Sequence, residues 1–136
     1  MIKAVIFDFY GVLNDGLEPN AQVLDFIKNK LKPSYKLGLL SNALDEFMYQ
    51  IVPEAELKSL FKDIIVSYRV GMAKPQVEVY RLAARNLGVE PKECVFIDDT
   101  SAFCQAAEEV GMQAVFYRDF DGFKTELGKL LAAANN

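Results

Sequence analysis

Polar side chains stand at or shortly after the ends of four short hydrophobic segments, and their types could bind a cation or take part in a reaction. They are Asp8, Ser41-Asn42, Lys74 and Asp98-Asp99. If these residues meet, the three carboxylates repel one another, and one lysine does not neutralise them, whereas a divalent cation does. Because oxygen-only ligand sets suit Mg²⁺, the sequence predicts a magnesium ion as cofactor.

The hydrophobic segments that precede these residues have the character of buried strands. They cover residues 4–7, 35–40, 64–66 and 94–97, and a fifth segment covers 113–116. Short apolar runs of this kind are typical of parallel strands that are buried on both faces. The carboxyl ends of parallel strands meet at one edge, where open α/β sheets bind ligands. We therefore expect the polar residues to converge in one crevice.

Helical patterns fill the stretches between the predicted strands. They cover residues 18–32, 44–51, 54–61, 75–87, 100–111 and 120–131. Strands that alternate with helices predict an α/β fold, here a three-layer αβα, Rossmann-like arrangement. Its five-stranded sheet is expected to be mainly parallel. The length is that of about one domain, so we expect residues 1–136 to form a single domain.

The composition excludes several kinds of site. The sequence contains no histidine, which rules out Ser-His-Asp and Cys-His triads, His-ligated zinc and an imidazole base. Cys94 and Cys104 fit no zinc or CxxC spacing, so we expect two reduced, mostly buried thiols. Proton transfer is left to Asp, Glu, Lys, Tyr or Cys.

Charge and hydropathy also limit the expected partners. The net charge is −4, without a block of like charges, which argues against nucleic acid or an anionic membrane surface as a partner. No apolar stretch is long enough to span a bilayer. The first predicted strand begins almost at Met1, so we expect no signal peptide. We therefore expect a cytoplasmic protein.

Four motifs together resemble the haloacid dehalogenase-like (HAD) hydrolase superfamily, and they are most similar to its subfamily IA. They are IFDFYGVL (6–13), LSNA (40–43), GMAKP (71–75) and VFIDDT (95–100), in the family's order. The resemblance covers residues 2 to about 117. It implies a HAD-like hydrolase core that hydrolyses phosphate monoesters with Mg²⁺.

The resemblance implies a nucleophile and a set of metal ligands. Asp8 would attack a phosphoryl group to give an aspartyl-phosphate, which water then hydrolyses. Mg²⁺ would be bound by Asp8, the backbone carbonyl of Tyr10, Asp98 and Asp99, and would screen the repulsion between two anions. As an isolated residue, Asp8 could instead be a strand-end cap or turn residue.

The resemblance also implies how the phosphate of a phosphorylated substrate is bound. Ser41 and the amides near Asn42 would contact its oxygens, and Lys74 would neutralise charge on the nucleophile and the phosphoryl group. Simpler interpretations remain for single residues. Ser41 could be a turn residue, Lys74 a surface lysine before a helix, and Asp99 a helix cap.

The sequence departs from the family at Tyr10. Phosphatases of the family usually have a second aspartate there, which protonates the leaving alkoxide and later activates water. Its loss typically costs about 10²–10⁴ in rate. Tyr10 is kept as a catalytic candidate because a tyrosine can donate a proton, although it is a poor base near neutrality. Asp15 could substitute for the missing acid.

Tyrosine at this position also resembles true haloacid dehalogenases, whose halide leaving group needs no proton. Those enzymes need a further carboxylate after the fourth motif, where this chain has Phe103. The pair Asp98-Asp99 is a motif for a metal, which a metal-free dehalogenase does not use. A dehalogenase is therefore the less favoured enzyme.

The second departure is the missing cap domain. Subfamily IA has a helical cap of many tens of residues after the first motif, whereas the spans from Asp8 to Ser41 and from Ser41 to Lys74 are short. A capless site could accept a bulky substrate, be covered by a partner or a second copy in a homo-oligomer, or do little chemistry. We expect a weak or specialised phosphatase, with a non-catalytic binding or interaction module as the alternative.

Overall fold

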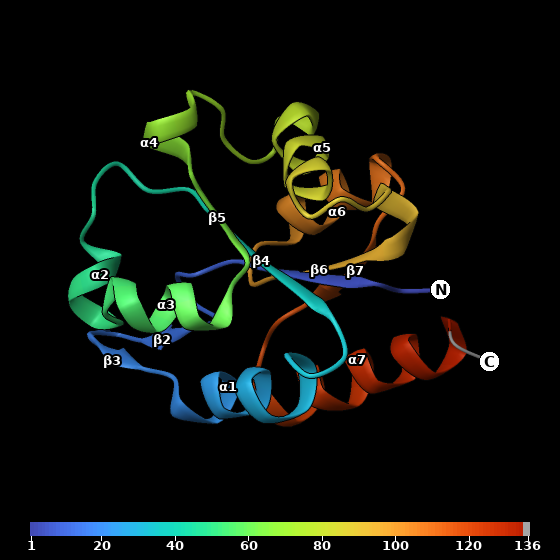
Figure 1. Ribbon diagram of the computed structural model, residues 1–136, viewed down its shortest axis with the longest axis horizontal. Helices are drawn as coiled ribbons and strands as arrows, with labels where there is room; N and C mark the ends of the chain where they lie inside the picture. Colours follow the sequence, from blue (N-terminus) through green and yellow to red (C-terminus); the bar gives the residue numbers. More distant parts are fainter. Residues whose placement is uncertain (135–136) are drawn as a thin grey trace.

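A sheet of five strands forms the centre of the computed structural model, which describes residues 1–134 (Figure 1). The strands are β1 (Ala4–Phe7), β4 (Lys36–Ser41), β5 (Asp63–Val66), β6 (Cys94–Asp98) and β7 (Gln113–Phe116). They are ordered β5-β4-β1-β6-β7, and every neighbouring pair is parallel. β1 is therefore the central strand, with β4 and β6 as its neighbours.

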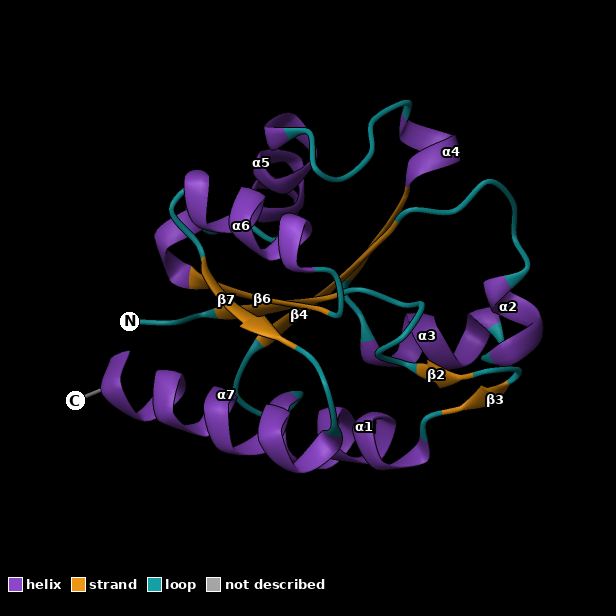
Figure 2. Cartoon of the chain, turned by 180° about the vertical axis from the view of Figure 1, so that it is seen from behind, coloured by secondary structure: helices purple, strands orange, loops and turns teal. Residues whose placement is uncertain are grey.

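Helices cover both faces of this sheet (Figure 2). One face carries α1 (Ala21–Phe26), the π-helical segment η1 (Ile27–Leu31), α2 (Met48–Ile51), α3 (Glu54–Leu60) and α7 (Phe120–Ala134). The other face carries α5 (Val77–Asn86) and α6 (Ser101–Glu109). The predicted three-layer, Rossmann-like α/β fold is thus confirmed.

The alternation of side chains along β1 builds two cores. Val5 and Phe7 point into the cluster beneath α1, α3 and α7, whereas Ala4 and Ile6 point into the cluster beneath α5 and α6. All four are completely buried, and full burial of a large aliphatic or aromatic side chain contributes about 1.5–3 kcal/mol. Burial on both faces explains why β1 is hydrophobic at every position.

The segment after the first motif differs from the expectation. The helix predicted for 18–32 begins at Ala21, because Glu18–Pro19 forms β3, paired antiparallel with β2 (Asn14–Asp15). The Asn20 side chain caps α1 by accepting a hydrogen bond from the Val23 amide at 3.3 Å. An asparagine cap of this kind stops the helix from extending toward the hairpin.

Other boundaries also moved. The helix predicted for 44–51 shrinks to α2, because residues 42–47 form a loop in which Asp45 accepts a hydrogen bond from the Phe47 amide at 2.9 Å. Two short helices were not predicted, α4 (Ser67–Val70) and the 3₁₀ turn η2 (Pro91–Glu93). The last helix, predicted to end at 131, continues to Ala134.

The described residues contain no cap domain. Between β1 and β4 lie the β2–β3 hairpin, α1 and η1, and between β4 and β5 lie α2 and α3. The carboxyl edge of the sheet is therefore left without a covering domain within residues 1–134. Among these residues, no helix combines the length and apolar character that crossing a membrane requires.

Candidate active site

Three neighbouring strands deliver polar side chains to the carboxyl edge of the sheet. Asp8 follows β1 directly, Ser41 is the last residue of β4, and Asp98 is the last residue of β6. β1 pairs with both other strands, so these residues lie side by side. All three are buried, although burying a charged side chain is costly unless it is paired.

Lys74 pairs two of these carboxylates at once. Its Nζ donates to Asp8 Oδ1 at 2.7 Å and to Asp98 Oδ2 at 2.8 Å, and the Lys74 side chain is 1% exposed. Two charge-assisted hydrogen bonds of this length offset much of the cost of burying the three charges. The lysine is therefore an internal counter-ion and not a surface residue.

Asn42 holds the backbone of Lys74 in place. The Asn42 amide group donates to the Lys74 carbonyl at 2.9 Å, and its Oδ1 accepts from the Lys74 amide at 2.9 Å. This reciprocal pair links the loop after β4 to the segment before α5. The sequence predicted Asn42 to be a substrate contact, and its clamp on Lys74 was not foreseen.

Two aromatic rings enclose the Lys74 ammonium. Its Nζ lies 5.6 Å from the ring centre of Phe96 and 5.2 Å from that of Phe103. Both distances are within the range of cation–π attraction. Phe103 thus faces the ammonium at the position where a dehalogenase would carry a carboxylate.

Burial and like charge act on the paired carboxylates. Burial raises the pKa of Asp8 above its usual range, Lys74 opposes that rise, and Asp98 adds to it. Burial also raises the pKa of Asp98, again against the effect of Lys74. Both carboxylates are therefore harder to ionise than a free aspartate, mainly because they are buried, and a bound cation would favour their charged forms.

Asp99 completes a cluster of three carboxylates. One oxygen each from Asp8, Asp98 and Asp99 lies within 4.8 Å of the other two, and Asp99 is exposed. The second oxygen of Asp98, Oδ1, accepts from the Thr100 amide at 2.9 Å, which fixes that carboxylate. A partly solvent-accessible set of hard oxygen donors with excess negative charge fits Mg²⁺.

Gly11 leaves the space that Asp99 uses. Its φ of +88° lies in the left-handed region, and a Cβ at this position would stand 1.9 Å from Asp99 Oδ2. Glycine is therefore required twice, for its backbone conformation and for its missing side chain.

Ser41 has a hydroxyl group that lacks a partner. Its Oγ is buried and makes no hydrogen bond within residues 1–134. Buried polar atoms are nearly always hydrogen-bonded, so an exception calls for an explanation. A ligand oxygen would supply the missing acceptor.

The two candidate acids lie in different surroundings. Tyr10 is partly buried, its ring packs edge-on against Phe9 at 5.1 Å, and burial together with the Asp45 carboxylate raises the pKa of its hydroxyl. Asp15 lies in β2 and is absent from the group of converging carboxylates found in the described residues.

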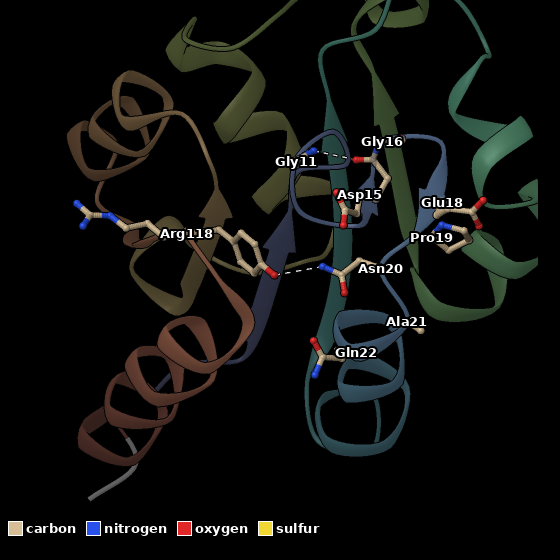
Figure 3. Close-up of a pocket in the computed structure, with 11 residues that line it drawn as sticks. Gly11, Asp15, Gly16, Glu18, Pro19, Asn20, Ala21, Gln22 and Arg118 are labelled. Atoms are coloured by element: carbon tan, nitrogen blue, oxygen red, sulfur yellow. Dashed lines mark hydrogen bonds between the residues drawn. The ribbon is translucent and has the colours of Figure 1, made fainter.

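Asp15 instead lines a cavity of about 580 Å³ beside the β2–β3 hairpin (Figure 3). Asn20 and Tyr117 also line this cavity, and Asn20 donates a hydrogen bond to the Tyr117 hydroxyl at 3.2 Å (Figure 3). Gly11 contributes to the same cavity and donates its amide hydrogen to Asn14 at 2.8 Å. The Arg118 side chain extends away from the cavity (Figure 3).

Comparison with known families gives one match over most of the chain. The profile of a family described as haloacid dehalogenase-like hydrolase matches residues 1–117. This span contains all the residues described above that converge at the sheet edge.

Individual relatives match a shorter part of the chain or match it at lower sequence identity. Bifunctional epoxide hydrolase 2 of the pig, Sus scrofa, is 40% identical over 75 residues, which are 55% of this chain and 14% of that protein. A glyceraldehyde 3-phosphate phosphatase of Methanopyrus kandleri is 24% identical over 119 residues, which are 87% of this chain and 51% of that protein. The chain thus spans about half the length of the second relative and far less of the first.

A solved structure shares the fold. A HAD family enzyme from Bacteroides thetaiotaomicron, crystallised with magnesium and inorganic phosphate, superposes with a TM-score of 0.74 at 20% identity. The match covers 87% of this chain and 95% of that chain.

Proposed function

This chain belongs to the haloacid dehalogenase-like hydrolase family, and we propose that it hydrolyses phosphate monoesters through an aspartyl-phosphate on Asp8, with Mg²⁺ as its cofactor. The observation that carries the proposal is the position of Asp8. Asp8 is buried at the end of the central strand and forms a salt bridge with Lys74. Its carboxylate also forms a cluster with those of Asp98 and Asp99. The similarity to a phosphatase and to a fold that binds magnesium and phosphate supports it.

The first step is an attack by Asp8. One of its oxygens bonds to phosphorus while the bond from phosphorus to the leaving oxygen breaks, and the leaving group departs with the bonding pair. Lys74 is a fixed positive charge that contacts the Asp8 carboxylate at Oδ1. When bound by Asp8, Asp98, Asp99 and the carbonyl of Tyr10, Mg²⁺ would screen the repulsion between carboxylate and phosphate.

Ser41 and the loop after it are proposed to bind the phosphate. The unpartnered hydroxyl of Ser41 would donate to a phosphate oxygen, and the amide groups near Asn42 would donate to others. Water then attacks phosphorus, the bond to Asp8 breaks, and inorganic phosphate leaves. Phosphoryl transfer depends mostly on positioning and electrostatics, so a small open site is sufficient.

Tyr10 is proposed to make the activity weak or specialised. The raised pKa of its hydroxyl makes it a poorer proton donor than a carboxylic acid. A missing acid/base group costs about 10²–10⁴ in rate for poor leaving groups.

The same residue favours a second candidate, a binding module without turnover. In that case the phosphate and Mg²⁺ would bind, but no ester would be cleaved.

The wider setting is proposed from the sequence. Residues 1–136 would form one HAD-like core domain that acts on a phosphorylated substrate, whose size the open site does not limit, and a second copy could cover that site. A cytoplasmic location and the absence of nucleic-acid or membrane partners stay predictions.

Hydrolysis of phenyl phosphate, measured with Mg²⁺ and after chelation, separates the two candidates. Turnover that needs Mg²⁺ is expected. A thermal shift with Mg²⁺ and inorganic phosphate, but no turnover, would favour the binding module.

A further inference from the structure

Exposed apolar side chains gather on the loop of residues 42–47 after β4 and on the short helix α4 after β5. Leu44 is 95% exposed, and Phe47, Tyr68 and Val70 are each about 40% exposed. We call these four residues the apolar rim. They are four of the seven large hydrophobic side chains that are exposed among the described residues, and exposed apolar side chains that gather in one region can mark a binding site.

Hydrogen bonds join the loop of residues 42–47 and helix α4 into one unit. Ser67 Oγ accepts from the Ala43 amide and donates to the Ala43 carbonyl, both at 2.9 Å. The Tyr68 hydroxyl donates to Glu46 at 2.8 Å, and Arg69 forms an ion pair with the same carboxylate. These bonds hold the two parts of the apolar rim in a fixed position relative to each other.

The rim is also continuous with the candidate site. Asn42, which clamps Lys74, immediately precedes Ala43, the residue that is hydrogen-bonded to Ser67. A group attached to a phosphate at Asp8 would thus meet the rim next.

The charges of residues 42–47 and 67–70 disfavour an anionic leaving group. Glu46 and Arg69 neutralise each other, and Asp45 is the remaining charged side chain of residues 42–47 and 67–70. Its carboxylate would repel a second negative group on the substrate. A neutral, apolar leaving group suits this surface.

The missing acid at position 10 points the same way. An alkoxide leaves slowly unless a proton is supplied, whereas a phenol, with a reference pKa of about 10, leaves much more readily as the anion. The loss of rate caused by Tyr10 in place of an acid is therefore smallest for aryl esters.

We propose that the preferred substrates are small aryl phosphomonoesters whose ring packs on the apolar rim, a step that rests on the function proposed above. Asp8 forms its bond to phosphorus as the bond to the aryl oxygen breaks, and the aryloxide takes a proton from solvent. Water then cleaves the aspartyl-phosphate, giving inorganic phosphate, and its remaining proton passes to solvent. The reaction consumes one water and needs no other co-reactant.

The first test compares leaving groups at matched size. Phenyl phosphate and cyclohexyl phosphate differ mainly in the stability of the leaving anion, and 2-naphthyl phosphate adds apolar area. We expect kcat/KM for phenyl phosphate to exceed that for cyclohexyl phosphate by at least about tenfold. The naphthyl ester should gain a further factor of about three to ten.

The second test removes the rim. The double substitution Leu44→Ser and Phe47→Ser should bring the naphthyl-to-phenyl ratio close to one, mainly through a higher KM for the naphthyl ester. Phe116→Ser, at a side chain that is 37% exposed on β7, is the matched control and should leave the ratio unchanged. A ratio that survives the rim substitutions overturns the inference, as does equal activity on phenyl and cyclohexyl phosphate.

A binding readout separates this inference from the proposed function. Naphthylmethylphosphonate, which cannot be hydrolysed, should bind more tightly than methylphosphonate, and the rim variant should lose the difference. If no ester is cleaved but this difference is present, the hydrolase proposal fails and the ring site stands. If sedimentation shows that the rim substitutions dissociate a dimer while the ligand preference is unchanged, the rim is an interface between copies and the inference is wrong.

Discussion

The carboxylate of Asp99 occupies the space that a side chain at position 11 would need. A Cβ on Gly11 would lie 1.9 Å from Asp99 Oδ2, so the Asp99 carboxylate can lie there only while position 11 is glycine. The loop that follows the nucleophile thus leaves the space in which the third carboxylate of the acidic cluster lies.

Gly11→Ala is therefore expected to displace Asp99 and weaken Mg²⁺ binding by at least about tenfold. The measurement is Mg²⁺ titration by calorimetry. Gly16→Ala is the matched control, because Gly16 also has a positive φ, +61°, but no atom within 4 Å of its Cβ position. Equal Mg²⁺ affinity in both variants would contradict the role given to Asp99.

Lys74→Met should strongly destabilise the protein without Mg²⁺. Among the described residues, Lys74 is the cation paired with both Asp8 and Asp98, and an unpaired buried charge costs about 3–5 kcal/mol. Urea unfolding measures the loss, and added Mg²⁺ should restore part of it. Lys58→Met removes an exposed pair with Glu54 at 3.5 Å and should cost at most about 0.5 kcal/mol. Similar losses in the two variants would argue against Lys74 as the internal counter-ion.

Alkaline pH should destabilise the fold through its buried thiols. Burial raises the pKa of Cys94 and of Cys104 from 9.0 to about 12. Below pH 9 the thiols are neutral in the folded and in the unfolded protein, so their contribution to the free energy of unfolding does not change with pH. Between pH 9 and 12 the unfolded thiols ionise first, and stability falls by up to about 1.4 kcal/mol per pH unit for each thiol.

Urea unfolding at pH 8.5 and 10.5 measures this loss, and Cys94→Ala should reduce it. The two thiols should also react slowly with a disulfide reagent in the folded protein at pH 8. Rapid reaction of both, without unfolding, would contradict their burial.

Tyr10→Asp should increase the hydrolysis of alkyl phosphates by at least about tenfold, because it supplies a carboxylic acid next to the nucleophile. Steady-state kinetics with cyclohexyl phosphate measure the gain. Tyr10→Phe is the control and should change little if the hydroxyl gives no proton. If Tyr10→Asp binds Mg²⁺ normally but gains nothing, the missing acid is not what limits the site.

The strand-end residues could be predicted from the sequence because their environment is local. Asp8 and Asp98 each follow a short apolar run, and parallel strands bring such ends together whatever lies between them. Lys74 is different, since it stands eight residues beyond β5. The strand-end argument brings it to the same edge of the sheet, but its contact with the nucleophile was indicated by the family resemblance.

The rest of the site depends on packing that no local pattern carries. The β2–β3 hairpin has strands of two residues each, too short for any alternation to be visible. The Asn42 clamp and the ring of Phe103 against Lys74 depend on how the loop after β4 and α6 dock on the sheet. From the sequence, Asn42 was therefore predicted to be a substrate contact. Phe103 was noted only because it stands where a dehalogenase has a carboxylate.

The most direct test of the central claim is Mg²⁺-dependent hydrolysis of phenyl phosphate by the wild type and by Asp8→Asn. Asparagine keeps the size of the side chain but is a far weaker nucleophile, and a thermal unfolding curve checks that the variant folds. The account predicts that turnover falls to the uncatalysed rate. Hydrolysis by Asp8→Asn as fast as by the wild type would show that Asp8 is not the nucleophile.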